Sequence, residues 1–439
     1  MPAASPTSAP APTFLALWRQ FLPLSVSDVT MAGSEPLVAT TLAHLPDPRV
    51  HLAALGVAKA IAIFLESPII MVLHAANALA GSSPARVALR HLVVWLSAGL
   101  TLALALLAVP PVFGWVAARL FGVAAPVEAA AHAALCLLLL WPAAIGWRRY
   151  VQGLLIAAGH GGVVGRAGLG RITVVAIGLG LGFQAGWPGA SVGASALVAG
   201  VTAEAVFVTL GAWRRGVFVL PAGPPDPALP HDVPGVWRYY RPLASSMLVV
   251  WGGRAAMIAI VARAADAPVA LAAWPAAWSL VTVIANATRM VQQLTIRHEA
   301  STPLPRLLAF AASVGATCSA LVLLLAATPW GHAGLAAFLG HDASLIAAAR
   351  PTVLACAAIP LLVALQNASQ GLLIARGATW AVSRGAWVGV GSGLACAAVA
   401  VAGGAPGAAA AATSMALGYA LELGALWLVW KISLGERRV

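Results

Sequence analysis

Several ionisable residues interrupt the apolar stretches near the N-terminus, and the spacing of four of them could support ion binding. Asp28 and Glu35 lie in the first stretch, and Lys59 and Glu66 lie in the second. If the two stretches form an antiparallel helical pair, a rise of about 1.5 Å per residue places Glu35 level with Lys59 and Asp28 level with Glu66. Two carboxylates that share a poorly hydrated cavity cannot both stay ionised easily. Asp28 and Glu66 are therefore the predicted ion-coupling residues, for a proton or Na⁺.

Both pairs also have structural interpretations. Glu35 and Lys59 could form a neutralising ion pair, or they could contribute to gating or binding of a substrate or ion. Asp28 could instead bond backbone groups freed around Pro23, and Glu66 could stabilise a kink at the proline that follows it. The sequence leaves these alternatives open.

The overall composition indicates which elements hold these residues. Of 439 residues, 61% are hydrophobic and only 9% are charged. An ordinary soluble domain is about one quarter charged and at most half apolar, so a soluble protein is excluded. The four cysteines lie in apolar stretches without metal-binding spacing, and no metal site is expected. We predict an all-α polytopic membrane protein.

Twelve stretches are long enough to cross a membrane as helices of roughly 20 residues. They are 17–45, 52–79, 88–118, 127–157, 163–184, 188–212, 236–262, 267–297, 303–328, 344–375, 380–402 and 406–431. A polar, proline-rich segment separates the first six from the last six. The predicted organisation is a disordered tail (1–12), an N-terminal lobe (13–212), a cytoplasmic linker (213–235), a C-terminal lobe (236–431) and a cytoplasmic tail (432–439).

The positions of the basic residues test this span count. With the N-terminus inside, 18 of the 25 lysines and arginines fall in inner segments and only three in outer loops. The remaining four, Lys59, Arg254, Arg289 and Arg350, fall within spans. Because short cytoplasmic loops carry the excess of positive charge, both termini are expected in the cytoplasm and the protein in the plasma (inner) membrane. The net charge of +12 therefore reflects topology.

The second half of the chain repeats the first. The run from Gln152 to Ala157 recurs without change from Gln370 to Ala375, at an offset of 218 in the numbering. At this offset Glu204 matches Glu422, and His132 matches Arg350, so we expect a shared architectural role for these four residues. Because each half has an even number of spans, the repeats are parallel, and we expect two pseudosymmetric six-helix lobes around a central cleft.

The match fails at the charged residues of the first two spans. At an offset of 219, Glu35 corresponds to Arg254 and Glu66 to Ala285. Arg254 and Arg289 are the residues most suited to an anionic ligand, because a guanidinium offers a planar fork of donors to carboxylate or phosphate. Alternatively, each arginine pairs with an acid of the first lobe and stabilises one conformation. The predicted substrate-binding set is thus Arg254, Arg289, Lys59 and Glu35.

Three segments resemble a known family. They are FLPLSVSDVTMAGSEP (Phe21 to Pro36), GVAKAIAIFLESP (Gly56 to Pro68) and WRRYVQGLLI (Trp147 to Ile156), and they resemble the progressive ankylosis protein family. The span layout resembles the wider group of MATE-type exporters in the multidrug/oligosaccharidyl-lipid/polysaccharide (MOP) exporter superfamily. These resemblances imply alternating-access export. For the first family they imply anions such as ATP, citrate or pyrophosphate, and for MATE-type exporters they imply cationic drugs exchanged for protons or Na⁺.

The predicted function is therefore secondary active export of a small organic or phosphate-rich anion. A proton- or sodium-coupled multidrug antiporter and a lipid-linked precursor flippase are the alternatives. A membrane enzyme that uses Asp28 and Glu66 as catalytic carboxylates is less favoured, because no loop offers a metal or nucleotide motif. The expected partners are a small-molecule substrate and membrane lipids, without nucleic acid or cofactor, and a monomer is expected.

Overall fold

The computed structural model describes residues 11–121, 125–220, 227, 229–339 and 343–435. All regular secondary structure in these ranges is helical. Eleven helical segments among them are long and apolar enough to cross a membrane. A further helix, α1 (Phe14–Ala43), has 30 residues but carries polar residues such as Ser25, Ser27 and Asp28. The all-α polytopic class is confirmed.

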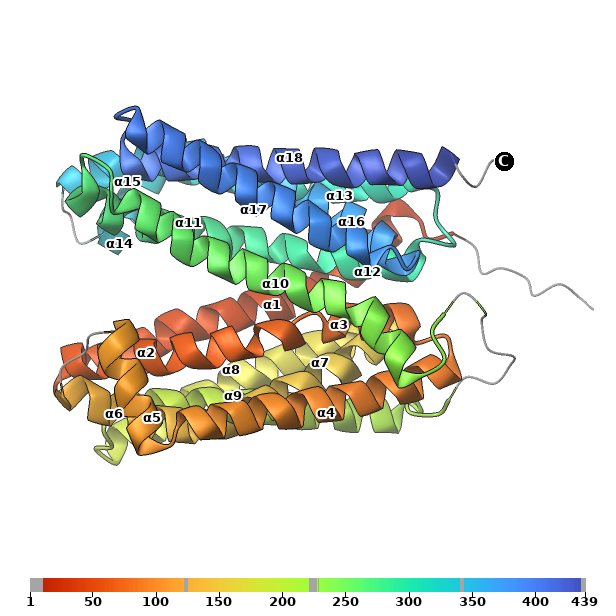
Figure 1. Cartoon of the computed structure of the whole chain (residues 1–439), viewed down its shortest axis with the longest axis horizontal. Helices are drawn as coiled ribbons and strands as arrows, with labels where there is room; N and C mark the ends of the chain where they lie inside the picture. The colour runs from red at the N-terminus through yellow and green to blue at the C-terminus, as the bar shows by residue number, and fades with distance from the viewer. Residues whose placement is uncertain (1–10, 122–124, 221–226, 228, 340–342, 436–439) are drawn as a thin grey trace, which may run out of the picture. The chain divides into compact units, whose positions relative to one another are not determined.

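Contacts divide the chain into two compact units. The N-terminal unit is Val26–Leu248, and the C-terminal unit joins the residues up to Ser25 to those from Val249 onward. Between α1 and α10, the N-terminal unit contains α2 (Pro48–Glu66), η1 (Ser67–Ile69), α3 (Val72–Leu79), α4 (Ser83–Leu107), α5 (Pro110–Val116), η2 (Ala117–Phe121), α6 (Ala125–Leu137), η3 (Leu138–Leu140), α7 (Trp141–Ala157), α8 (Gly161–Gln184) and α9 (Gly189–Arg214). After α10 (Val233–Val261), the C-terminal unit contains α11 (Ala267–Asn286), η4 (Ala287–Arg289), α12 (Met290–His298), α13 (Leu304–Ala327), α14 (Pro329–Leu339), α15 (Ala343–Ala355), α16 (Ile359–Ala375), α17 (Thr379–Ala402) and α18 (Gly407–Gly435). Figure 1 labels these helices.

The unit boundaries lie inside α1 and α10, whereas the predicted lobes 13–212 and 236–431 are separated at the linker 213–235. The reason is local packing. Trp18 and Phe21 of α1 make edge-on ring contacts with Phe310 of α13, in the C-terminal unit. The hydroxyl of Tyr240 in α10 donates a hydrogen bond to the carbonyl of Pro68, in the N-terminal unit. Residues 1–10 of the predicted first tail and 436–439 of the predicted last tail lie outside the described residues, and α18 extends into the last one.

The predicted repeat is confirmed by the helix boundaries. The bounds of α6, α7 and α8 coincide with those of α15, α16 and α17 when the repeat offset is applied. Gly159 and Gly377 follow α7 and α16 with φ of 85° and 78°, a left-handed conformation that glycine adopts without steric cost. The same turn therefore connects equivalent helices in both units.

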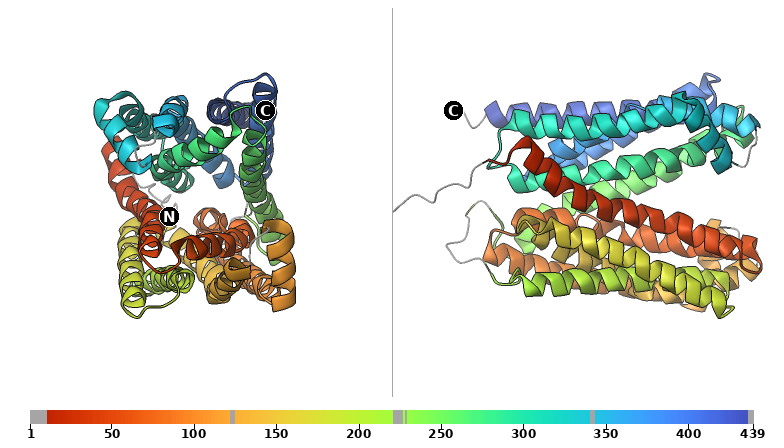
Figure 2. Two further views of the ribbon diagram at one scale, coloured as in Figure 1. Left: turned by 90° about the vertical axis from the view of Figure 1, so that its left-hand side faces the viewer. Right: turned by 180° about the vertical axis from the view of Figure 1, so that it is seen from behind.

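Each unit has its own apolar core. Val175 and Leu197 belong to the core of the N-terminal unit, where α8 packs along α9. Val281 and Val353 belong to the core of the C-terminal unit, where α17 packs along α18. In both units the long helices run nearly side by side (Figure 2).

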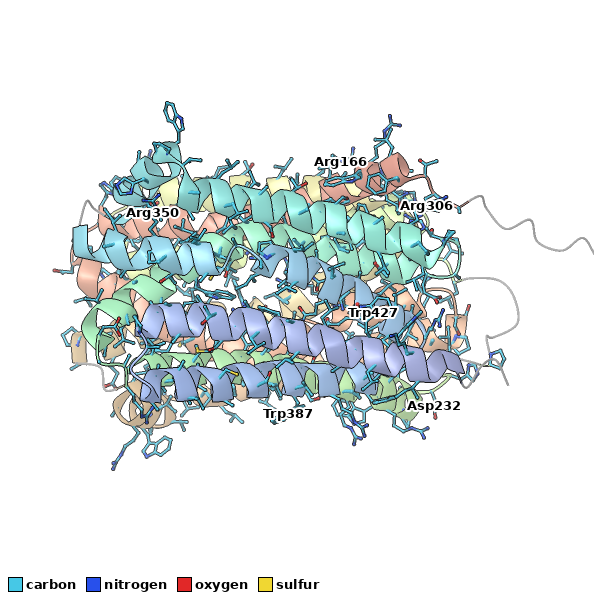
Figure 3. The ribbon with its side chains drawn as sticks, turned by 90° about the horizontal axis from the view of Figure 1, so that it is seen from above. Arg166, Asp232, Arg306, Arg350, Trp387 and Trp427 are labelled. Carbon is cyan, nitrogen blue, oxygen red and sulfur yellow. The ribbon has the colours of Figure 1, made fainter. Side chains whose placement is uncertain are left out.

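Large apolar side chains also cover the outer surfaces. Trp330, Trp95 and Trp387 are 88%, 76% and 63% exposed, and Figure 3 shows Trp387 projecting from its helix. Such exposure is expected where lipid replaces water as the surrounding medium. Within the C-terminal unit, Arg306 and Arg350 lie toward opposite ends of the helices (Figure 3).

The crossing of α7 and α3 yields a stability prediction. A Cβ atom at Gly153 would lie 2.5 Å from the Leu73 carbonyl oxygen, so Gly153→Ala must separate the two helices. We expect this variant to be less stable by roughly 1–3 kcal/mol, measured as a lower midpoint of thermal unfolding in detergent. Gly162→Ala in α8 is the control, because no atom lies within 4 Å of its Cβ position. Equal midpoints for both variants would contradict the close approach of α7 to α3.

Candidate functional site

Glu204 of α9 lies at the centre of a buried charged cluster in the N-terminal unit. Arg148 of α7 forms an ion pair with it, and Nη1 of Arg171 of α8 lies 3.3 Å from its Oε2 atom. Gln152 Nε2 donates to Oε1 at 2.9 Å. All four side chains are buried. Glu204 is thus neutralised by two cations, and the cluster connects three helices of the unit.

Two arginines of this cluster bear on the predicted distribution of basic residues between the two sides of the membrane. Arg148 and Arg171 fall among the bases assigned from the sequence to the cytoplasmic side. Both are buried and used in internal ion pairs, so fewer bases than predicted are free to face water or lipid headgroups.

Glu66 ends α2 and belongs to the same cluster. The indole Nε1 of Trp141 donates a hydrogen bond to Glu66 Oε2. Arg148, Arg149 and Arg171 all interact with this carboxylate electrostatically. The environment of Glu66 is therefore strongly cationic.

The two residue pairs predicted between α1 and α2, Asp28 with Glu66 and Glu35 with Lys59, stay predictions. Asp28 is only 3% exposed, and its Oδ2 atom has no hydrogen-bond partner among the described residues. No hydrogen bond or ion pair joins Asp28 to Glu66 in the described part of the chain. Lys59 is half-buried in α2, and the side chain of Glu35 lies outside the described residues.

Glu422 of α18 takes the place of Glu204 in the C-terminal unit. Gln370 Nε2 donates to Glu422 Oε1 at 2.9 Å, which repeats the contact between Gln152 and Glu204. Gln366 also hydrogen-bonds to the Glu422 carboxylate. One amide contact to the glutamate is thus shared by the two repeats.

The arginines, by contrast, are not repeated. At the repeat offset, Arg148 corresponds to Gln366 and Arg171 corresponds to Gly389. A Cβ atom at Gly389 would lie 2.7 Å from Glu422 Oε2, so the carboxylate occupies the space beside this glycine. Among the residues that the structure describes, no lysine or arginine forms an ion pair with Glu422, which is 4% exposed. Within those residues, Glu422 is therefore a buried carboxylate without a partner cation.

A small cavity of about 60 Å³ lies beside Glu422, within the C-terminal unit. Its walls come from α10, α11, α16, α17 and α18, the last three of which lie together in the blue part of the ribbon (Figure 1). Its polar lining consists of Arg254, Gln366, Tyr419 and Glu422. Glycines and apolar side chains complete the wall, including the large ring of Trp278. An apolar cavity with a few polar groups is typical of a small-molecule site.

Arg254 lines this cavity from α10. Its guanidinium carbon lies 4.4 Å from the centroid of the Trp251 ring, a cation–π contact. In the described part of the C-terminal unit, no carboxylate forms an ion pair with it. Arg289 interacts with Arg254 electrostatically, and Tyr419 interacts with both Arg254 and Glu422. The cavity thus holds a guanidinium and a carboxylate that are not paired with each other.

His132 and Arg350 make equivalent contacts. His132 Nε2 donates to the carbonyl of Ala108 at 2.8 Å, and Arg350 Nε donates to the carbonyl of Ala326 at 2.8 Å. The two carbonyls are related by the same repeat offset, so each side chain ties a helix to the end of a preceding one. Neither residue lines the cavity in the C-terminal unit.

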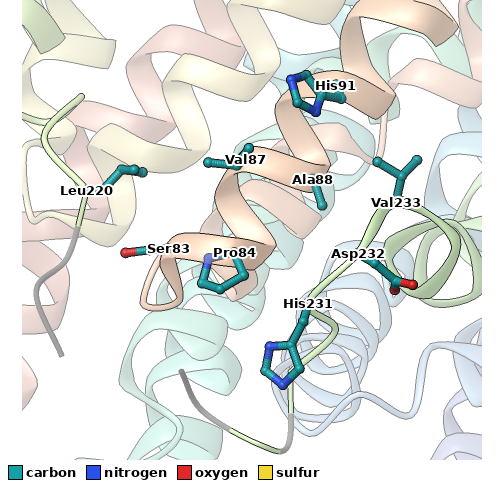
Figure 4. Close-up of a pocket in the computed structure, with 9 residues that line it drawn as sticks. All are labelled: Ser83, Pro84, Val87, Ala88, His91, Leu220, His231, Asp232 and Val233. Atoms are coloured by element: carbon teal, nitrogen blue, oxygen red, sulfur yellow. The ribbon is translucent and has the colours of Figure 1, made fainter. Parts of the chain in front are cut away.

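A second pocket, of about 500 Å³, lies where α4 begins and the chain enters α10 (Figure 4). Ser83 and His91 line it from α4, and His231 and Asp232 line it from the segment before α10. Its lining includes none of the predicted site residues.

Gln366, Gly389 and Tyr419 line the cavity close to Glu422 and were not predicted as site residues from the sequence. For Gln366 and Gly389, however, the sequence contained a usable signal. A position-by-position comparison of the repeats shows that Gln366 and Gly389 replace Arg148 and Arg171 while the glutamate between them is retained.

Three solved structures share this fold. A MOP superfamily transporter from Pyrococcus furiosus, described as having a binding pocket of reversed polarity, has a TM-score of 0.78 and 13% identity over 96% of each chain. A MATE protein in complex with MaL6 has a TM-score of 0.77 and 14% identity over 96% of each chain. An outward-facing multidrug resistance MATE transporter has a TM-score of 0.75 and 15% identity over 95% of each chain. The chain therefore has the fold of MATE and other MOP superfamily transporters.

No family model and no curated protein matches the sequence. The likeness is thus one of fold, and the function must be argued from the residues of the cavity.

Proposed function

We propose that this protein is a secondary transporter that exports a small organic or phosphate-rich anion, such as ATP, citrate or pyrophosphate, by alternating access. The fold is that of membrane transporters, and the segments that resemble the progressive ankylosis protein family support the same class of substrate. We place the protein in the plasma membrane with both termini in the cytoplasm, on the distribution of lysine and arginine. It acts as a transporter rather than an enzyme.

The observation that carries the proposal is Arg254. A guanidinium inside an apolar protein is costly unless it has a partner. Within the described part of its own unit Arg254 has no carboxylate partner, and it lines an internal cavity together with Gln366, Tyr419 and Glu422. An anionic group on a substrate would supply the missing partner, and Arg289 would add a second positive charge nearby.

A cationic drug is the second candidate substrate. Glu422 lines the same cavity, and the aromatic ring of Trp278 together with Met257 and Met415 would suit an apolar cation. The neighbouring structures include a multidrug resistance transporter. In that case Arg254 would oppose binding and its removal would help.

Transport by Arg254 variants tests the proposal. Purified protein in liposomes is assayed with radiolabelled ATP, citrate, pyrophosphate and a cationic dye. For the anion that is transported, Arg254→Ala is expected to lower the rate about 10- to 100-fold, because a charge-assisted contact contributes roughly 1.5–3 kcal/mol. Arg254→Glu is expected to abolish transport.

Arg166→Ala is the matched control, because Arg166 is an exposed arginine of the N-terminal unit. It is expected to transport at the wild-type rate. Transport of the dye alone, with an undiminished rate in Arg254→Ala, would reject the anion in favour of the second candidate.

A further inference from the structure

We propose that Glu422 and Arg254 act together, so that a proton on Glu422 and an anion at Arg254 are bound at the same time and carried in the same direction. This inference rests on the proposed function, because it requires an anion at Arg254. It makes the protein a proton–anion cotransporter, in which export of the anion carries a proton outward and is driven by the outward gradient of the anion.

The first step of the argument is the charge of Glu422. A buried ionised carboxylate must be neutralised by a neighbour, a bound cation or a proton. In the N-terminal unit, Arg148 and Arg171 neutralise Glu204. The corresponding positions in the C-terminal unit are uncharged, and no lysine or arginine of the described residues forms an ion pair with Glu422, which leaves a proton or a bound cation to neutralise it directly.

The second step concerns the kind of cation. A metal ion such as Na⁺ or Ca²⁺ requires several oxygen ligands. Around Glu422, Gln366 and Gln370 hydrogen-bond to the carboxylate, Tyr419 lines the same cavity, and the rest of the wall beside the carboxylate is glycine and apolar. In the described part of the chain, no three histidine, cysteine or acidic side chains are grouped as for a metal. Arg254 in the same cavity would also repel a metal ion. A proton needs no further ligands and is the cation that fits.

The third step is the charge balance of the cavity. When Glu422 is ionised, its charge cancels that of Arg254, and the cavity offers little net attraction to an anion. When Glu422 carries a proton, the cavity has a net positive charge. Electrostatic interactions are strong in a poorly hydrated site, so the proton raises the affinity for an anion. By reciprocity, a bound anion raises the affinity of Glu422 for a proton.

Glu422 is the group that can change charge in this environment. Arg254 of α10 and Tyr419 of α18 line the same cavity, and Tyr419 also interacts electrostatically with Arg289 of η4 and with Cys356, which lies between α15 and α16. Arginine stays charged, and tyrosine and cysteine ordinarily titrate above neutral pH. Helix α17 contributes Gly389, Val390, Gly393 and Leu394, which carry no charge.

Calorimetry of the full-length protein tests the coupling. ATP is titrated into wild type and Glu422→Gln in two buffers of different ionisation enthalpy, at acidic and at neutral pH. Because the same ATP solution is titrated into both proteins, the protons exchanged by ATP itself cancel when the two proton uptakes are compared. We expect wild type to take up about one more proton per ATP than the variant, and its affinity to rise about tenfold or more toward acidic pH relative to the variant.

Transport gives the second readout. In liposomes with an imposed proton gradient, wild type should move ATP in the direction of proton flow, whereas Glu422→Gln should move ATP only down its own gradient. Glu422→Asp, which keeps the carboxyl group, should retain the coupling. Asp28→Asn tests the other candidate for ion coupling, and a loss of proton uptake in this variant alone would overturn the inference.

The outcomes separate the two proposals. If none of ATP, citrate and pyrophosphate binds, the proposed function fails. If ATP binds but wild type and Glu422→Gln take up equal numbers of protons, or if Asp28→Asn alone loses the uptake, this inference is wrong while the proposed function stands. If Glu422→Gln does not fold, the infrared difference spectrum of wild type decides. ATP must then produce a new band of a protonated carboxyl group, and its absence overturns the inference.

Discussion

Glu204→Gln is expected to lower the stability of the protein by about 3–5 kcal/mol, the usual effect of removing one partner from a buried ion pair. The substitution preserves shape but removes the ion-pair partner of Arg148 and Arg171, and only the electrostatic interaction of both arginines with Glu66 remains. The two guanidinium groups would then repel each other and weaken the packing of α7 on α8. The midpoint of thermal unfolding in detergent, followed by tryptophan fluorescence, measures the effect.

The matched control is the same substitution in the other repeat. Glu422→Gln removes a carboxylate that has no ion pair among the described residues, and it keeps an oxygen that can accept the hydrogen bond from Gln370. Its unfolding midpoint should equal or exceed that of wild type. Equal losses of stability in both variants would show that the two glutamates do the same structural work, contrary to their different surroundings.

Gln366→Arg is expected to reduce transport at least about tenfold while the protein stays folded. Position 366 corresponds to that of Arg148, whose guanidinium neutralises Glu204. An arginine there would pair with Glu422, supply a permanent positive charge and fill the small cavity beside the carboxylate. The rate of ATP transport in liposomes and the unfolding midpoint are measured on the same preparation.

The reciprocal change, Arg148→Gln, is the control for position 366. It leaves Glu204 with Arg171 as its remaining ion-pair partner, and it should lower the unfolding midpoint. Wild-type transport by Gln366→Arg would show that neither the open cavity nor the free carboxylate is needed for activity.

The fold was predictable because it depends on patterns that run along the chain. Apolar length defines the spans, and one constant offset relates α6, α7 and α8 to α15, α16 and α17. The site was harder to predict. Counting residues gives the depth of Asp28 and Glu66, whereas the direction of a side chain depends on rotation about the helix axis.

The role of a buried arginine also depends on the groups that surround it in the fold. Arg148 and Arg254 are both arginines in apolar segments, and the sequence alone does not separate an internally paired guanidinium from one that lines a cavity. The difference depends on the nearby carboxylate. Arg148 forms an ion pair with Glu204, whereas Arg254 lines a cavity in which the carboxylate of Glu422 lies beyond hydrogen-bonding distance. Only the packing of several helices brings such groups together or holds them apart.

The division of α1 between the two units has a consequence for biosynthesis. Trp18, Gln20 and Phe21 are translated long before the residues that they contact. Gln20 accepts hydrogen bonds from Arg297 at 2.8 Å and His298 at 2.9 Å, and the two aromatic rings meet Phe310. The first turns of α1 therefore cannot form these contacts until α12 and α13 have been synthesised. Completion of the C-terminal unit is thus also the step that fixes the first turns of α1 in place.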